Sequence, residues 1–236
     1  MTTRLALSET HRRVLQENPW LSLLDQAVSD DVLAHSRLRK LTGGQALFRR
    51  GENPDGLYIV LDGSLRISGT TREGQEAVLV FCEPGRWIGL VSGLDGGARM
   101  HDVLATSPSV VLQIAPADLE QLIAQHPSFG RLLLRVQCSQ MRELLMGIET
   151  YSTHSLEQRF AGRLLALAAA FGDPAPDGAL DIQLRLSQET LAQLLGTTRQ
   201  RVNQLLKLWE QNGLIRQKYG RIRLLDQAQL KVLAQV

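Results

Sequence analysis

Residues 186–209 read LSQETLAQLLGTTRQRVNQLLKLW, and their pattern predicts two short helices joined by a tight turn. The hydroxyl of Ser187 can cap the first helix, because Ser is a preferred residue at that position. Gly196 suits the left-handed conformation that ends a helix, and Thr197 or Thr198 can cap the next one. The apolar stripe of the second helix consists of Val202, Leu205, Leu206 and Trp209. Two such helices form a helix-turn-helix.

The second helix, expected over about Thr198–Gln211, has a polar face without acids. No Asp or Glu occurs from Thr197 to Trp209, whereas an ordinary solvated helix mixes both signs. In the major groove Arg pairs with guanine, and Gln or Asn pairs with adenine. The candidate DNA-contacting residues here are Ser187, Gln188, Thr198, Arg199, Gln200, Arg201, Asn203, Gln204 and Lys207. The alternative is a basic surface helix on an ordinary helical hairpin.

A β-hairpin is expected directly after this helix. Two short alternating runs, 214–218 and 221–225, surround a Tyr-Gly pair, which is a hairpin signal. Lys218 and Arg221 near its tip are candidate phosphate contacts. Such contacts supply affinity and register but carry no sequence information. The hairpin is therefore expected to be a basic wing beside the helix-turn-helix.

The charge of the 236 residues is divided unevenly along the chain. From Ile182 to the end there are nine Lys or Arg and three Asp or Glu, whereas the whole chain carries only +2, so residues 1–181 carry −4. This asymmetry indicates a nucleic-acid partner for the C-terminal part alone. No run of about 18 apolar residues and no signal peptide is visible, so we expect a cytoplasmic protein without a membrane partner.

The N-terminal half predicts a different architecture. Residues 5–40 have helical spacing, and twelve of the twenty Gly then fall between Gly43 and Gly97. Short β-type runs occupy 46–49, 57–61, 65–68, 77–81, 103–105 and 110–115. Closely spaced strands with Gly turns indicate an antiparallel barrel or roll, and Pro116 then begins a short helix. Cys82 and Cys138 stand among apolar neighbours and are expected to be free, buried thiols.

A long helical pattern runs from Pro127 to about Tyr151, and its apolar face is broad. Such a stripe exposed on a monomer would be a liability, so we expect a homodimer. The alternative is a helix wholly buried within one subunit. Another helix is expected over Leu156–Phe171, followed by a Pro/Gly loop. The expected fold class is α+β: a jelly-roll-like antiparallel β-roll (1–126), a long dimerisation helix (127–152) and a winged helix-turn-helix (153–236).

The whole pattern resembles the CRP/FNR family of bacterial transcription regulators. In the roll the resemblance is carried by Gly51-Glu52, GLYIVLDG at 56–63, GQE at 74–76 and PGRWIG at 84–89. In the C-terminal part it is carried by QRFAGRLL at 158–165 and by the stretch 186–209. It implies a cyclic-nucleotide-binding roll, a dimer on a two-fold symmetric DNA operator, RNA polymerase as a further candidate partner, and a shift of the DNA modules about residues 149–155.

Carried over by position, Arg199, Gln200 and Gln204 match the places from which the family reads bases. The family often has Arg, Glu and Arg there, so the two glutamines depart from the pattern. Glu accepts a hydrogen bond from cytosine, whereas Gln favours adenine. The resemblance therefore implies a palindromic operator whose base sequence differs from the family's usual one.

The effector site implied by the resemblance departs further. Its matching residues are Gly89, Leu90, Arg99, Met100 and, from the long helix, Leu144 and Leu145. Arg99 matches the arginine that neutralises a cyclic phosphate, but Leu90 replaces the ribose acceptor, and leaving a polar group unpaired costs about 1–3 kcal/mol. We therefore expect a regulator that cyclic AMP does not control. Cyclic AMP acting through Arg99 stays open as the alternative.

A heme-based gas sensor is a second alternative, because His101 stands beside Met100 in the same region. The N-terminal cysteine cluster of oxygen-sensing members is absent, so no iron–sulfur cluster is expected, and the cofactor stays unknown. The chain also lacks Gly-x-Gly-x-x-Gly, a Walker-type loop and His-Glu-x-x-His. No enzymatic activity is therefore expected.

Overall fold

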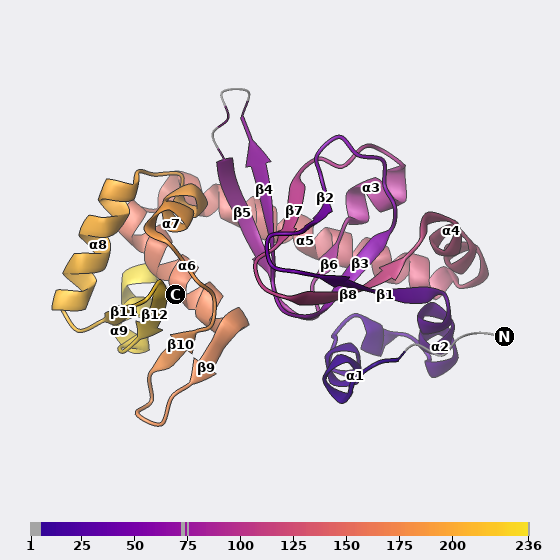
Figure 1. The fold of residues 1–236 in the computed structure, drawn as a ribbon, viewed down its shortest axis with the longest axis horizontal. Coiled ribbons are helices and arrows are strands. Elements are labelled where there is room, and N and C mark those ends of the chain that lie inside the picture. The colour runs from indigo at the N-terminus through magenta and orange to yellow at the C-terminus, as the bar shows by residue number, and fades with distance from the viewer. Residues whose placement is uncertain (1–5, 72–73, 75, 236) are drawn as a thin grey trace. The chain divides into compact units, whose positions relative to one another are not determined.

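The computed structural model describes residues 6–71, 74 and 76–235. The chain divides into two compact units (Figure 1). The first contains Met1–Gly69 and Val80–Leu144, and the second contains Thr70–Leu79 and Leu145–Val236. None of the helices in the described part of the chain combines the length and apolar character that crossing a bilayer requires.

The roll consists of two four-stranded antiparallel sheets, with strand orders β1-β8-β3-β6 and β2-β7-β4-β5. Most of it belongs to the first unit, since residues 76–79 of β5 are grouped with the second. The strands are β1 (Ser36–Leu41), β2 (Ala46–Phe48), β3 (Leu57–Asp62), β4 (Leu65–Thr70), β5 (Glu76–Cys82), β6 (Trp87–Ile88), β7 (Asp102–Ala105) and β8 (Ser109–Ile114). The helical elements are α1 (Glu9–Gln16), η1 (Leu21–Leu23), α2 (Gln26–Ala34), α3 (Leu90–Asp95), α4 (Pro116–Gln125) and α5 (Pro127–Thr153). The expected β-roll followed by a long helix is confirmed.

Strand β3 lies at the centre of the roll and is buried on both faces. Side chains of a strand alternate between its two faces. Leu57 and Ile59 join the apolar cluster that includes Phe129 of α5. Tyr58 and Val60 join the other cluster, formed between the two sheets. One strand therefore links the sheet-to-sheet core to the helical layer.

The N-terminal prediction was wrong in part, because residues 36–41 form a strand and not the end of a helix. Helix α2 ends at Ala34, and β1 pairs with β8 along its whole length, from Ser36 opposite Ile114 to Leu41 opposite Ser109. The two leucines of SRLRKL are three residues apart, so the segment lacks the alternation of polar and apolar residues that marks a strand with one buried face. Pairing with β8 satisfies the backbone hydrogen bonds of residues 36–41, and this pairing outweighs their local helical spacing.

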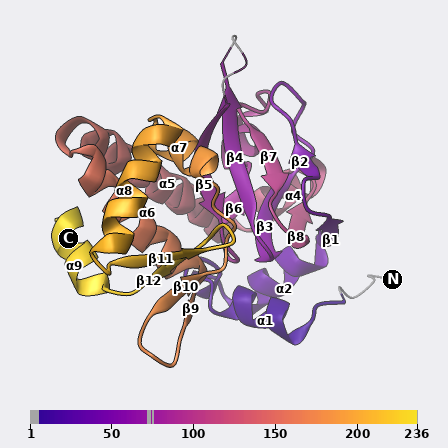
Figure 2. The same cartoon turned by 60° about the vertical axis from the view of Figure 1, so that its left-hand side comes forward.

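The second unit contains α6 (Leu156–Phe171), α7 (Gln188–Leu195), α8 (Arg199–Gln211), α9 (Gln227–Ala234) and one sheet of order β11-β12-β10-β9. Its strands are β9 (Gly172–Pro174), β10 (Leu180–Ile182), β11 (Ile215–Lys218) and β12 (Arg221–Leu224). The helix-turn-helix and the wing are confirmed, and the hairpin β11–β12 lies beside α8 (Figure 2). The expected Pro/Gly loop was wrong in part, since β9 falls within it. Pro174 is tolerated there because β9 is an edge strand.

Candidate nucleic-acid interface and effector pocket

The helix-turn-helix is fixed by the capping bonds that its sequence predicts. The Ser187 hydroxyl accepts from the backbone N–H of Thr190 at 3.0 Å, and that of Thr198 accepts from Arg201 N–H at 3.3 Å. Gly196 between them has φ +62°, a left-handed conformation that glycine adopts without strain. The entry angle of α8 is therefore set by local backbone chemistry.

The inner face of α8 is anchored on α6. Val202, Leu206 and Trp209 are buried. The Trp209 ring stacks on Phe160, with 4.9 Å between centroids, and its Nε1 donates to Glu157 Oε1 at 3.0 Å. An aromatic pair with this geometry adds about 0.5–1.5 kcal/mol beyond its area burial. The helix is thus held rigidly enough to present its other face.

The outer face of α8 carries exposed polar side chains, namely Arg199, Gln200, Arg201, Gln204 and Lys207. None of these side chains has a hydrogen-bonding partner among the residues that the structure describes. Asn203 differs, because its Oδ1 accepts from Gln188 Nε2 at 3.1 Å. Gln188 and Asn203 therefore tie α7 to α8, while the five exposed side chains are available to a partner.

The wing places its two predicted cations at the tip. Lys218 and Arg221 are exposed and directly opposite each other in the pairing of β11 with β12. The turn between them has φ +51° at Tyr219 and +74° at Gly220. Tyr219 is 90% exposed, and Lys218 Nζ lies 5.7 Å from its ring centroid. Sequence reasoning treated Tyr219 only as a turn signal and missed it as a surface group of the tip.

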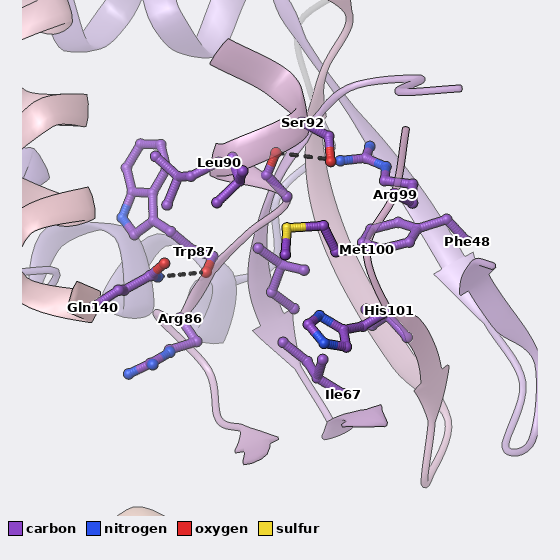
Figure 3. Close-up of a pocket in the computed structure, with 14 residues that line it drawn as sticks. Phe48, Ile67, Arg86, Trp87, Leu90, Ser92, Arg99, Met100, His101 and Gln140 are labelled. Atoms are coloured by element: carbon purple, nitrogen blue, oxygen red, sulfur yellow. Dashed lines mark hydrogen bonds between the residues drawn. The ribbon is translucent and has the colours of Figure 1, made fainter. Parts of the chain in front are cut away.

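A pocket of about 150 Å³ opens in the roll (Figure 3). Of the residues that the family resemblance assigns to an effector, Gly89, Leu90, Arg99 and Met100 line it. Leu144 and Leu145 lie outside this pocket and are more than half exposed. Gln140 is the residue of α5 that reaches it, and its Nε2 donates to the carbonyl of Trp87 at 2.9 Å.

Several lining residues were not predicted, namely Phe48, Ile67, Arg86, Trp87, Ile88, Val91, Ser92, Val103 and Gln140. They come from β2, β4, β6, α3, β7 and α5, and from the turn before β6, so they are far apart in the sequence. No local spacing brings such residues together. Only the pairing of the strands could have identified them.

The guanidinium of Arg99 is held by the protein itself. Its side chain is 1% exposed, and Nη2 donates to the Gly56 carbonyl at 2.6 Å and to Asp55 Oδ1 at 3.1 Å. Nη1 donates to the Gly89 carbonyl at 3.2 Å. The group also lies 4.0 Å from the centroid of the Phe48 ring, within the range of a cation–π contact.

Asp55 is the charge partner of Arg99. Burial raises the pKa of Asp55, but hydrogen bonds to Tyr58 and Arg99 outweigh burial, so the net pKa lies below the ordinary 3.8. Leu90 is 2% exposed and belongs to the apolar cluster around β3 and α5. The pocket wall at the position that the family uses for a ribose is therefore hydrocarbon, and the nearby cation is already neutralised.

His101 also lines the pocket. Burial, and then the positive charge of Arg50, lower the pKa of His101 below the ordinary 6.5, so its imidazole is neutral at pH 7. Across the described ranges of the chain, no group of three or more His, Cys, Asp or Glu is arranged to hold a metal ion.

The prediction for the two cysteines was right for one and wrong for the other. Both are free, and Cys82 is fully buried, which raises its pKa to about 12. Cys138 is exposed. On α5 the neighbouring Leu133 and Val136 take the buried face, and Cys138 falls off that face by helical geometry.

Comparison with known proteins agrees with this arrangement. Residues 38–126 match the cyclic nucleotide-binding domain family, and residues 158–233 match the Crp-like helix-turn-helix domain family. The chain is 31% identical over 173 residues to the CRP-like cAMP-activated global transcriptional regulator of Mycobacterium tuberculosis, and the match spans 73% of this chain and 77% of that relative.

Two further relatives extend the match over the chain. It is 28% identical over 214 residues to the transcriptional activator protein Anr of Pseudomonas protegens, covering 91% of this chain and 86% of Anr. The solved structure of a CRP-family transcriptional regulator from Thermus thermophilus superposes with a TM-score of 0.72 at 25% identity, covering 84% of this chain and 97% of that one. The chain therefore belongs to the CRP/FNR family of DNA-binding transcription regulators.

Proposed function

We propose that this regulator binds a two-fold symmetric DNA operator as a homodimer, with α8 of each copy in the major groove. One observation carries the proposal: Arg199, Gln200 and Gln204 are exposed and unpartnered, within the described residues, on a helix whose other face is anchored. Arg199 reads guanine, and the two glutamines read adenine. The half-sites lie about one helical turn apart, as for other dimeric helix-turn-helix proteins.

The remaining candidate residues serve position and affinity in this proposal. The hydroxyl-bearing caps, the flanking cations and the wing tip contact phosphates: Ser187, Thr198, Arg201, Lys207, Lys218 and Arg221. Gln188 and Asn203 act through the hydrogen bond between them, which fixes α7 against α8. Phosphate contacts of this kind set the register of the protein on the duplex.

The homodimer is supported by the exposed face of α5. Leu134, Met141 and Ile148 recur every seven residues, and Leu144 and Tyr151 are also seven apart and three residues beyond Met141 and Ile148. All five are about half exposed or more. This is the a/d pattern of a two-stranded coiled coil, so the occupant is a second copy of the same helix. The proposed modules are the roll (1–126), the dimerisation helix (127–152) and the DNA-binding domain (153–236).

We propose that cyclic AMP does not control this chain. The Nη groups of Arg99 are engaged by Asp55 and two backbone carbonyls, and its guanidinium lies against the Phe48 ring, although its Nε has no partner among the described atoms. Leu90 offers no acceptor to a ribose hydroxyl. The pocket volume of about 150 Å³ is also below the roughly 300–1,000 Å³ usual for drug-sized ligands. The M. tuberculosis relative is named as cAMP-activated, but that name describes the relative.

Heme is disfavoured by the same geometry. Among the described residues that line the pocket, His101 supplies the single imidazole, and the cavity is too small for a porphyrin without rearrangement. We therefore propose a ligand other than cyclic AMP or heme, or none, and leave the cofactor unassigned. A cytoplasmic location, contact with RNA polymerase and action by binding without catalysis complete the proposal.

Selection of bound DNA from a random pool, with and without cyclic AMP, tests both the DNA assignment and the effector assignment. We expect an enriched palindrome in both samples, and no saturable heat when cyclic AMP is titrated into the protein. Enrichment only with cyclic AMP, together with micromolar binding, would overturn the effector assignment. Absence of any enriched sequence would overturn the DNA assignment.

A further inference from the structure

A second cavity, of about 380 Å³, lies within the DNA-binding unit itself. Its walls come from the last turns of α5, from α6, from the turn between α7 and α8, and from α9. All of these segments belong to the unit that contains residues 145–236. The cavity is therefore separate from the roll pocket and from the outer face of α8.

The permanently charged side chains that line this cavity are both cations. Arg159 and Arg163 of α6 line it, and so does His154, whereas no Asp or Glu is among the described residues that do so. The two arginines are four residues apart, so they lie on one face of the helix, where like charges repel each other. Neither guanidinium forms an ion pair with any described carboxylate. Two cations of one helix face thus line the cavity without a counter-charge among the described residues.

The hydrogen-bonding capacity of the two arginines is also unfilled. Arg159 Nε is buried and has no partner among the described atoms, and its guanidinium lies 4.2 Å from the centroid of the Tyr151 ring. Burial alone lowers the pKa of Arg163, which shows that no described acid compensates its desolvation. A buried donor without a partner is unfavourable unless a ligand or water satisfies it.

A neighbouring side chain adds a further donor. Gln158 uses its Oε1 to accept from Ser155 N–H at 2.7 Å, which leaves its amide N–H groups for the cavity. Gly162 and Ala166, which also line it, leave the space beside the arginines open because they carry almost no side chain. The cavity thus combines two planar, positively charged guanidinium groups with room for a ligand larger than a water molecule.

We propose that this cavity binds a phosphate group through Arg159 and Arg163. Guanidinium groups recognise phosphate by paired, charge-assisted hydrogen bonds. The phosphate belongs either to a small phosphate-bearing ligand or to the DNA backbone, and both sources share the same chemistry. Because Gly196 and Tyr151 also line the cavity, a bound phosphate connects the end of α5 to the turn before α8.

The test uses the full chain in the absence of DNA, with pyrophosphate as the probe and sodium chloride at matched ionic strength as the reference. We expect saturable heat in calorimetry with pyrophosphate, and at least tenfold weaker binding for Arg163→Gln and for Arg159→Gln. The matched control is Arg185→Gln, which removes the same charge from an exposed position outside the cavity. It is expected to bind the probe like the original chain. Far-ultraviolet circular dichroism confirms that each variant is folded.

A second arm identifies the source of the phosphate. If the DNA backbone supplies it, Arg163→Gln lowers the slope of log affinity against log salt by about 0.9, and Arg185→Gln does not. If a free ligand supplies it, the slope is unchanged and only pyrophosphate binding is lost. No saturable heat together with equal slopes for both variants overturns the proposal. Failure of the original chain to bind any operator overturns the proposed function instead, since the pyrophosphate arm contains no DNA.

Discussion

Arg99 and Asp55 form an ion pair in the roll, with Nη2 3.1 Å from Oδ1 and the arginine side chain only 1% exposed. The arginine that the family resemblance assigns to a cyclic phosphate is therefore used to hold the pocket together. Gly89 stands close by, and a Cβ built there would lie 2.5 Å from Arg99 Nη1. A ligand phosphate would have to compete with the present acceptors of Nη1 and Nη2, whereas Nε has no partner among the described atoms.

Substitution Arg99→Gln is expected to destabilise the protein by about 1–3 kcal/mol, because it removes the charged donor of Asp55 Oδ1 and of two carbonyls, whereas Arg39 still pairs with Asp55 Oδ2. Urea unfolding followed by circular dichroism measures the change. The matched control is Arg185→Gln, an exposed arginine without a described partner, which should stay within about 0.5 kcal/mol. Equal stabilities for the two variants would show that the Arg99 network contributes nothing.

The same pair predicts a dependence of stability on pH. The folded-state pKa of Asp55 is below 3.8, so the ionised carboxylate stabilises the fold above that value, and the contribution is lost as the pH falls through the lowered pKa. The Asp55→Asn variant lacks this contribution. The difference in unfolding free energy between the original chain and the variant should be constant near neutral pH and shrink below 3.8. A constant difference down to the acid transition would contradict the assignment.

The helix-turn-helix could be predicted from the sequence because each of its determinants is local. The caps Ser187 and Thr198, the left-handed Gly196 and the buried Val202 all act within a few residues of one another. The pocket in the roll could not be predicted in this way. Its walls depend on which strands pair, and Gln140 reaches it only because α5 passes beside β6.

The predictions that were wrong failed for the same reason, because they depended on contacts between segments that are distant in the sequence or on which face of a helix is buried. Residues 36–41 have side chains compatible with either a helix or a strand, and the partner β8 that decides between them lies about seventy residues away. Cys138 is flanked by Gln137 and Ser139, and the nearby apolar residues Leu133 and Val136 occupy a different face of α5. Composition and spacing describe a segment; they do not describe the surface that it will meet.

Substitution Arg199→Ala is expected to weaken operator binding by about 1–3 kcal/mol and to relax the preference for guanine at one position of each half-site. The reason is the loss of a bidentate contact that no neighbouring side chain can replace. Competition between the operator and single-base variants measures the discrimination. Unchanged discrimination would mean that α8 does not read this base pair through Arg199.

Substitution Lys218→Ala should behave differently, because a phosphate contact carries no sequence information. All DNA sequences are expected to bind more weakly by a similar factor, and the salt slope should fall by about 0.9. Fluorescence anisotropy at several salt concentrations, with operator and unrelated duplexes, measures both quantities. The control is Lys231→Ala on α9, away from the wing tip, which should leave the slope unchanged.

Substitution Leu144→Glu is expected to separate the dimer. Leu144 is 58% exposed in a single chain and lies within the seven-residue pattern of Met141, Ile148 and Tyr151. A carboxylate in a coiled-coil seam must be buried without a partner, and the same charge from the second copy opposes it. Sedimentation velocity at micromolar concentration should show a monomer.

The control Val232→Glu places the same charge on an exposed apolar residue of α9, and it should sediment like the original chain. Because two half-sites are read by two copies, Leu144→Glu should also lose most of its affinity for the palindrome while keeping its weak affinity for an isolated half-site. A variant that stays dimeric would place the subunit contact on another face of the molecule.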